Sequence, residues 1–110
     1  MSVVSSSIAG GTSDIGKLIG STYGVANVTM TLADTEYSYA LPAGTKYWKI
    51  QNRDAGLIKL AFASGTSGTT WFSVWPGNQE DGYIKNSTAS VTLYFQSPKA
   101  AQTLEIYTLS

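Results

Sequence analysis

The sequence offers few side chains that could carry acid–base or nucleophilic chemistry. None of its 110 residues is Cys or His, which excludes disulfides, thiolate metal sites and the imidazole base of most nucleophilic triads. The closest carboxylate pairs are Glu80 with Asp81 and Asp34 with Glu36, and two carboxylates at a suitable separation can hydrolyse a glycoside. Both pairs lie in or beside predicted turns, where solvated acids are common. We therefore expect a protein that is not an enzyme and has no catalytic residues.

A run of oxygen-bearing side chains, Asn78-Gln79-Glu80-Asp81, follows the Pro76-Gly77 turn. Its composition suits a hard cation, but it lacks the spacing of a calcium loop, so we interpret it as an ordinary polar turn. No glycine-rich segment has the form of a phosphate-binding loop. Two Asn-X-Ser/Thr motifs, at Asn27 and Asn86, are interpreted as coincidental in a chain rich in Ser and Thr. The sequence therefore predicts no metal site and no cofactor.

The tryptophans are the most informative side chains. Trp71 and Trp75 share a strand face with Ser73, opposite Phe72 and Val74. If Phe72 and Val74 face the core, the two indole rings face outward together. Large exposed apolar groups on a weakly charged surface suggest a protein interface or the stacking of a sugar. The alternative is that the rings cap the edge of the core or pack beneath the N-terminal segment.

The charge of the chain limits the class of partner. Seven basic and seven acidic residues give a net charge of zero, and only 13% of the residues are charged. A neutral chain is poorly suited to holding a phosphate backbone by charge, so we expect no nucleic-acid partner. No apolar run approaches the ~20 residues of a membrane span, and the first residues lack the pattern of a signal peptide. We expect no membrane association.

From Val25 onward, short segments with period-two alternation are separated by turn residues, at a spacing typical of all-β sandwiches and barrels. The expected strands are 25–32, 35–41, 46–52, 57–63, 69–75, 81–86, 89–96 and 101–109. They predict an antiparallel β-sandwich of jelly-roll type with under ~10% helix. The predicted core contains Ile50, Ile58, Leu60, Phe62, Phe72, Val74, Val91, Leu93, Phe95, Leu104 and Ile106.

Residues 1–24 differ from the sandwich predicted at 25–110. They contain five glycines and only two charged residues, which favours an extended N-terminal arm over a helix. The alternative is a frayed terminus, but disordered tails usually carry fewer large apolar groups. The apolar side chains that we expect to fill shallow pockets on a partner are Ile8, Ile15, Leu18, Ile19 and Tyr23.

Residues 35–110 contain a series of short strand and turn motifs. These are 40–46 (Ala-Leu-Pro-Ala-Gly-Thr-Lys), 50–52 (Ile-Gln-Asn), 75–78 (Trp-Pro-Gly-Asn), 91–97 (Val-Thr-Leu-Tyr-Phe-Gln-Ser) and 104–107 (Leu-Glu-Ile-Tyr). Together they resemble small β-rich virion proteins of tailed bacteriophages, most closely capsid decoration (cement) proteins. The resemblance implies a structural protein on the capsid exterior that binds the major capsid protein and stabilises contacts between its subunits, with the arm lying on the shell.

Two other functions remain open. A carbohydrate-binding module would use Trp71 and Trp75 to stack sugars, and a head-fibre or tail adaptor would use exposed Trp and Tyr. For the decoration protein, icosahedral shells present three-fold and quasi-three-fold junctions, which closed cyclic oligomers fit. We therefore expect a homo-oligomer, a trimer in preference to a dimer at two-fold positions.

Overall fold

The computed structural model describes residues 22–84 and 91–110, and these residues form eight strands and no helix. Within this part of the chain, no helix is long and apolar enough to cross a membrane. The strands are β2 (Tyr23–Met30), β3 (Tyr37–Ala40), β4 (Tyr47–Asn52), β5 (Ile58–Ala61), β6 (Phe72–Val74), β7 (Gln79–Tyr83), β8 (Thr92–Gln96) and β9 (Gln102–Leu109).

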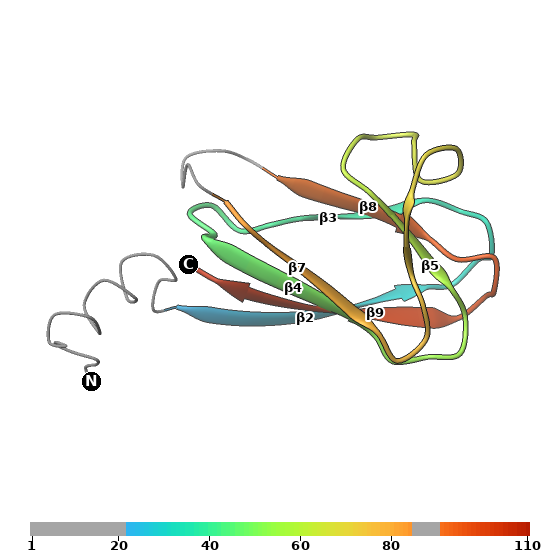
Figure 1. Ribbon diagram of the computed structural model, residues 1–110, viewed down its shortest axis with the longest axis horizontal. Coiled ribbons are helices and arrows are strands. Elements are labelled where there is room, and N and C mark those ends of the chain that lie inside the picture. The colour runs from blue at the N-terminus through green and yellow to red at the C-terminus, as the bar shows by residue number, and fades with distance from the viewer. Residues whose placement is uncertain (1–21, 85–90) are drawn as a thin grey trace, which may run out of the picture.

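The strands form two four-stranded sheets that lie one over the other as two layers (Figure 1). One sheet has the order β2-β9-β4-β7 and the other the order β3-β8-β5-β6, and every pairing is antiparallel. The chain passes from one sheet to the other at almost every connection, which is the connectivity of a jelly roll. The predicted all-β sandwich of jelly-roll type is confirmed.

The core lies between the two sheets, where the inward side chains of both layers meet. Most of the predicted core residues are buried, and Val91 is half-buried against them. Met30, Leu41 and Trp48 join the same cluster. The predicted core residues that are buried are Ile50, Ile58, Leu60, Val74, Leu93, Phe95, Leu104 and Ile106.

Two predicted core residues are exposed instead. Phe62 is 56% exposed and Phe72 is 54% exposed. The alternation that would bury Phe62 ends with β5 at Ala61. Phe72 pairs with buried Leu60 and so has the inward parity, but β6 is the edge strand of its sheet. Val74 has the same parity in this strand and is buried, so it is the position of Phe72 at the first residue of an edge strand that leaves its ring in solvent.

The strand bounds also differ from expectation at both ends of the sandwich. β2 begins at Tyr23, which pairs with Leu109, so the last two residues of the predicted arm belong to the sheet. β6 is shorter than the predicted strand 69–75, because the backbone N–H groups of Thr69 and Thr70 donate to the carbonyl of Thr66 in a turn, at 3.0 and 2.8 Å.

A buried amide fixes the position of β6 and of the turn that leads to β7. The Asn52 side chain is fully buried, and its Nδ2 donates to the carbonyls of Gly56 and Val74, each at 2.8 Å. The Asn52 carbonyl accepts from the N–H of Gly77 at 2.8 Å. Gly77 has φ of +80°, a conformation that glycine adopts without strain. These bonds join the ends of β4 and β6 to the turn before β7.

Candidate functional site

Both tryptophans that the sequence singles out are exposed and come from the two ends of β6. Trp71 is 40% exposed and Trp75 is 57% exposed. The Trp71 Nε1 donates to Ser73 Oγ at 3.2 Å, and the Lys59 Nζ lies 4.2 Å from the centroid of the Trp71 ring. A cation over an indole face is a favourable contact, and here it holds one side of the Trp71 ring.

Phe62 and Phe72 add to these tryptophans at the same edge of the second sheet. We name the four side chains Phe62, Trp71, Phe72 and Trp75 the aromatic edge. The first three line an open groove of about 550 Å³ together with Leu60, Ala61, Ala63, Thr66 and Thr70. No charged side chain lines this groove, so its surface is apolar apart from the two threonines. Trp75 lies outside the groove, at the other end of β6, and is exposed there.

The loop between β5 and β6, which carries Trp71, is held by a carboxylate from outside it. The Glu36 carboxylate accepts from the N–H of Gly65 at 2.8 Å, the N–H of Ser67 at 3.1 Å and the Ser67 hydroxyl at 2.5 Å. The hydroxyl of Ser67 in turn accepts from Gln96 Nε2 at 2.9 Å. The Ser67 hydroxyl, followed by the N–H of Gly65, lowers the pKa of the Glu36 carboxyl, because these bonds favour its charged form.

Four tyrosines cross the outer face of the other sheet, one from each strand. We name Tyr23, Tyr107, Tyr47 and Tyr83 the tyrosine row, in the order of strands β2, β9, β4 and β7. The distances between neighbouring ring centroids along the row are 6.2, 6.3 and 5.0 Å. These spacings are typical of aromatic pairs in contact, so the row is a continuous aromatic strip across the sheet.

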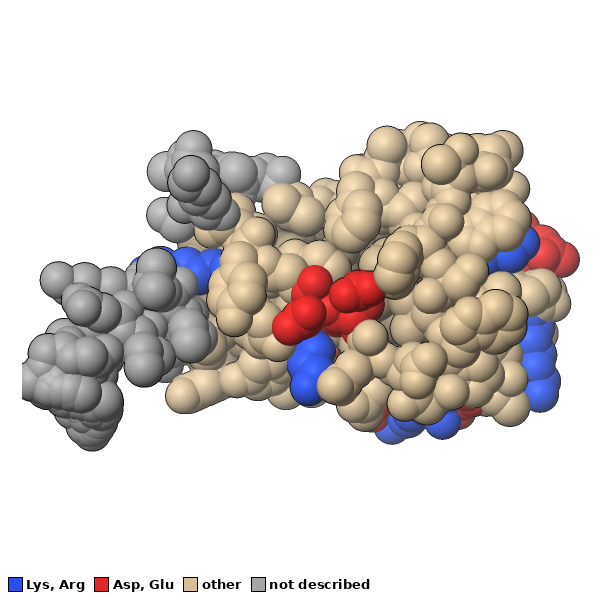
Figure 2. Space-filling model, viewed as in Figure 1, with Lys and Arg blue, Asp and Glu red and all other residues tan. Residues whose placement is uncertain are grey.

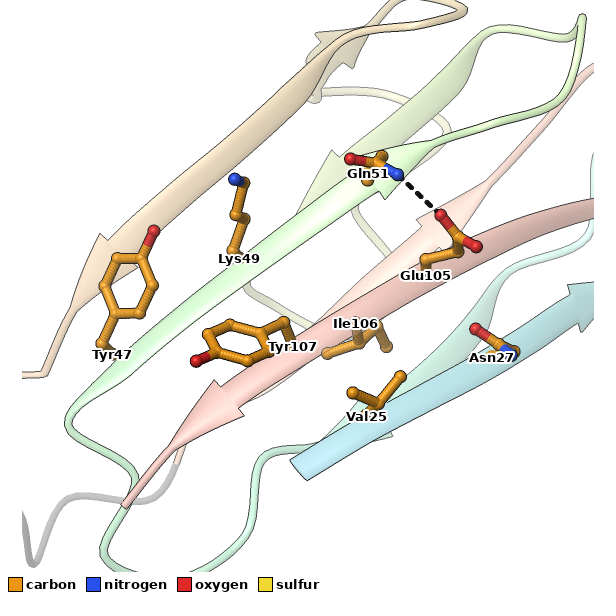
Figure 3. Close-up of a pocket in the computed structure, with 8 residues that line it drawn as sticks. All are labelled: Val25, Asn27, Tyr47, Lys49, Gln51, Glu105, Ile106 and Tyr107. Atoms are coloured by element: carbon orange, nitrogen blue, oxygen red, sulfur yellow. Dashed lines mark hydrogen bonds between the residues drawn. The ribbon is translucent and has the colours of Figure 1, made fainter. Parts of the chain in front are cut away.

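A shallow groove of about 430 Å³ runs beside the tyrosine row (Figure 3). Its polar side chains come from the next positions along the same strands, because residues two apart lie on one face. Gln51 Nε2 donates to Glu105 Oε1 at 2.8 Å, and the other Glu105 oxygen accepts from Arg53 at 3.0 Å. The lining residues are Val25, Asn27, Tyr47, Lys49, Gln51, Glu105, Ile106 and Tyr107.

The Tyr47 hydroxyl in this groove is held in its neutral form. The Tyr47 hydroxyl donates to Asp81 Oδ2 at 2.9 Å. Burial, with Asp81 as the next cause, raises the pKa of Tyr47 to about 12, because both disfavour a phenolate. Tyr47 is therefore a neutral donor at any physiological pH. Lys49 forms no salt bridge with another described residue.

Charged side chains occupy little of the visible surface. Figure 2 shows acidic side chains gathered in one patch over β7, with a basic side chain beside them and uncharged residues over most of that face. Among residues 22–84 and 91–110, no three acidic side chains gather in a way that could hold a metal ion.

The predicted arm residues Ile8, Ile15, Leu18 and Ile19 lie outside the described residues. Tyr23 lies in β2, is 70% exposed and stands at one end of the tyrosine row. Tyr23 therefore lies apart from Trp71 and Trp75, which flank β6 of the other sheet.

The tyrosine row was not singled out by the sequence analysis. Alternation already places Tyr47, Lys49 and Gln51 on the outward face of one strand. The row, however, exists only because β9 lies between β2 and β4. The period-two pattern predicts the sheet face on which each residue lies but not the order of the strands. A site to which four strands contribute therefore cannot be predicted from this pattern.

No protein-family model matches the sequence, and the search of curated proteins finds no match. Among solved structures, the chain is similar to a de novo designed double-stranded β-helix, with 16% identity, a TM-score of 0.48 and coverage of 80% of this chain and 97% of that one. It is also similar to a protein of Bacillus endospore appendages, described as disulfide-linked pili, with 20% identity, a TM-score of 0.42 and coverage of 81% and 88%. At these values neither similarity bears on function.

Proposed function

We propose that the protein is a structural virion protein: a capsid decoration protein that binds the exterior of a bacteriophage head and stabilises contacts between major capsid subunits. The observation that carries this proposal is the aromatic edge. Jelly rolls occur in viral capsid proteins and in lectins, so the fold by itself does not choose between these functions.

The aromatic edge has the chemistry of a protein-docking surface. Its four large side chains are each at least 40% exposed although the sandwich beside them is well packed. The interiors of protein interfaces are depleted of charge and enriched in Trp, Tyr and Phe. Burying one such side chain contributes roughly 1.5–3 kcal/mol. A shell surface that covers the aromatic edge would therefore supply most of the binding free energy.

A second docking element is the edge strand β2. It has eight residues without a charge or a proline, and no described strand lies along its outer side. Natural proteins usually protect such edges with charges, prolines or bulges, because an open edge accepts strands from other chains. Residues 1–21 precede β2 directly, and we propose that their apolar side chains, with Tyr23, bind the shell. We propose a homotrimer on the shell.

The test is binding to purified heads of the bacteriophage that carries the gene. Labelled protein is mixed with unexpanded and with expanded heads, and the heads are sedimented. We expect saturable co-sedimentation with heads at a fixed ratio to the major capsid protein, and heads that resist heat better when decorated. Binding to tails or fibres and not to heads would instead support the adaptor function.

The carbohydrate-binding alternative at Trp71 and Trp75 has less support. Lys59 already lies over one face of the Trp71 ring, and Trp75 lies at the opposite end of β6. The groove at the aromatic edge is lined by apolar groups and two threonines. A sugar would find few partners there for its hydroxyl groups.

A further inference from the structure

We propose that the groove beside the tyrosine row binds a neutral oligosaccharide, in addition to the proposed docking of the aromatic edge to a capsid. The apolar face of a pyranose ring would lie on Tyr107, with Tyr47 beside it, and the hydroxyl groups of the sugar would bond to the polar side chains of the groove. This site lies on a different sheet from the aromatic edge, so both surfaces can be occupied at once.

The aromatic part of the site is pre-arranged. Tyr107 and Tyr47 come from adjacent strands, and their ring centroids lie 6.3 Å apart with an angle of 70° between the rings. Both rings are half-buried, and Tyr47 is further held by its bond to Asp81. A ligand that stacks on them orders few side chains, which lowers the entropic cost of binding.

The polar part matches a ligand rich in hydroxyl groups, which both donate and accept hydrogen bonds. Asn27, Lys49 and Gln51 present two amides and one ammonium along the groove (Figure 3). Glu105 accepts one bond at each carboxylate oxygen, from Gln51 and Arg53, and each oxygen retains further acceptor capacity. The groove therefore offers donors and acceptors side by side along its length.

The charge balance argues for a neutral ligand. Lys49 and Arg53 are the basic groups in and beside the groove, and Glu105 and Asp81 are the acidic ones. A polyanion would gain from two of these groups and be repelled by the other two, at distances where salt screens little. Nucleic acids and acidic polysaccharides are therefore disfavoured, whereas an uncharged sugar chain meets no repulsion.

The first experiment presents the whole protein to a printed array of neutral and acidic oligosaccharides. A neutral oligosaccharide that binds is then titrated into ¹⁵N-labelled protein. We expect the largest amide shifts at Asn27, Lys49, Gln51 and Tyr107, with Trp71 and Trp75 unchanged. Binding of no oligosaccharide, binding of acidic ones alone, or shifts centred on Trp71 and Trp75 would each overturn the proposal.

The second experiment uses matched tyrosine variants. Tyr107→Ala should weaken binding of the same oligosaccharide at least about tenfold. The control is Tyr94→Ala, since Tyr94 is equally half-buried in β8, on the other sheet. If Tyr107→Ala fails to fold, Gln51→Ala replaces it, because Gln51 is exposed. Unchanged binding in the Gln51 and Tyr107 variants, or equal loss in the Tyr94 variant, would overturn the proposal.

Discussion

The aromatic edge and the tyrosine row are both exposed and aromatic, yet their surroundings are chemically opposite. On the aromatic edge, Phe62, Trp71 and Phe72 line a groove without charged side chains, and Trp75 is exposed at the other end of β6. The tyrosine row lies beside the polar side chains of Asn27, Lys49, Gln51 and Glu105. Of these, Gln51 and Glu105 are hydrogen-bonded to each other. The neighbours of these exposed rings, more than the rings themselves, are the reason why we propose a protein partner for one surface and a sugar for the other.

Trp48 connects the two surfaces through the interior. Its side chain is only 6% exposed, and its ring lies 5.8 Å from that of Phe62 on the aromatic edge. On its other side it lies beneath Gly82 of β7, where a Cβ would approach the indole to 2.8 Å. β7 also carries Tyr83 of the tyrosine row. One buried ring therefore packs against the aromatic edge and against the strand that carries Tyr83.

The largest effect is expected when this connection is removed. Trp48→Ala leaves a cavity between the sheets, and we expect the free energy of unfolding to fall by about 3–5 kcal/mol, as is usual for a buried Trp. Chemical denaturation of the variant measures this loss. The control is Trp75→Ala, which removes an exposed ring and should cost less than about 1 kcal/mol. Equal losses in the two variants would contradict the burial of Trp48.

The next largest effect is expected on binding to phage heads, when side chains of the aromatic edge are removed. The double variant Phe72→Ser/Trp75→Ser removes two large side chains of the aromatic edge, and we expect it to weaken binding to phage heads about a hundredfold. Oligosaccharide binding should not change. Leu32→Ser is the matched control, since Leu32 is 60% exposed but lies outside both surfaces. Head binding that survives the double variant would remove the aromatic edge from the docking surface.

Deleting residues 2–20 should have a smaller effect on head binding, a weakening of at least about tenfold. The sandwich should keep its melting temperature, because its terminal pairing starts with Thr22, whose N–H donates to the carbonyl of Ser110 at 3.0 Å. Calorimetry and co-sedimentation measure the two quantities. A truncated chain that binds heads as tightly as the full chain would show that the arm is only a frayed terminus.

The smallest effect concerns the loop that carries Trp71. Glu36→Gln removes the charge from three hydrogen bonds, and we expect a loss of less than about 1 kcal/mol at pH 7. Because the folded pKa of Glu36 is lowered from 4.5, its contribution is complete above that value and is lost as the pH falls through the lower, folded pKa. Melting temperatures of the variant and the wild type should therefore differ at pH 7 and converge at acidic pH. A difference that persists in acid would contradict this role.

Much of the fold could be predicted because each strand carries its own signal. In β8, for example, Leu93 and Phe95 alternate with Thr92 and Tyr94, and the inward pair is fully buried. The signal failed at Phe62 and Phe72, where a strand ends or lies at the edge of its sheet. The alternation pattern predicts which face of a strand a side chain lies on. It does not predict whether a neighbouring strand is present to cover that side chain.

The candidate sites were only partly predictable for a related reason. The exposure of Trp71 and Trp75 follows from local parity within one strand, and the structure places both rings in solvent. The tyrosine row needs four strands in a given order and register, for example Tyr47 opposite Tyr83. Strand order results from packing of the whole chain, so the contacts of the row join residues 36 to 84 positions apart, which no local pattern encodes.

The central claim, that the two aromatic surfaces serve different partners, is tested most directly by a cryo-electron microscopy reconstruction of phage heads decorated with the protein. We predict that Phe62, Trp71, Phe72 and Trp75 are buried against the major capsid protein, and that Tyr107, Tyr47 and the groove beside them face solvent. A reconstruction in which Tyr107 and Tyr47 contact the shell while the aromatic edge remains in solvent would contradict the account.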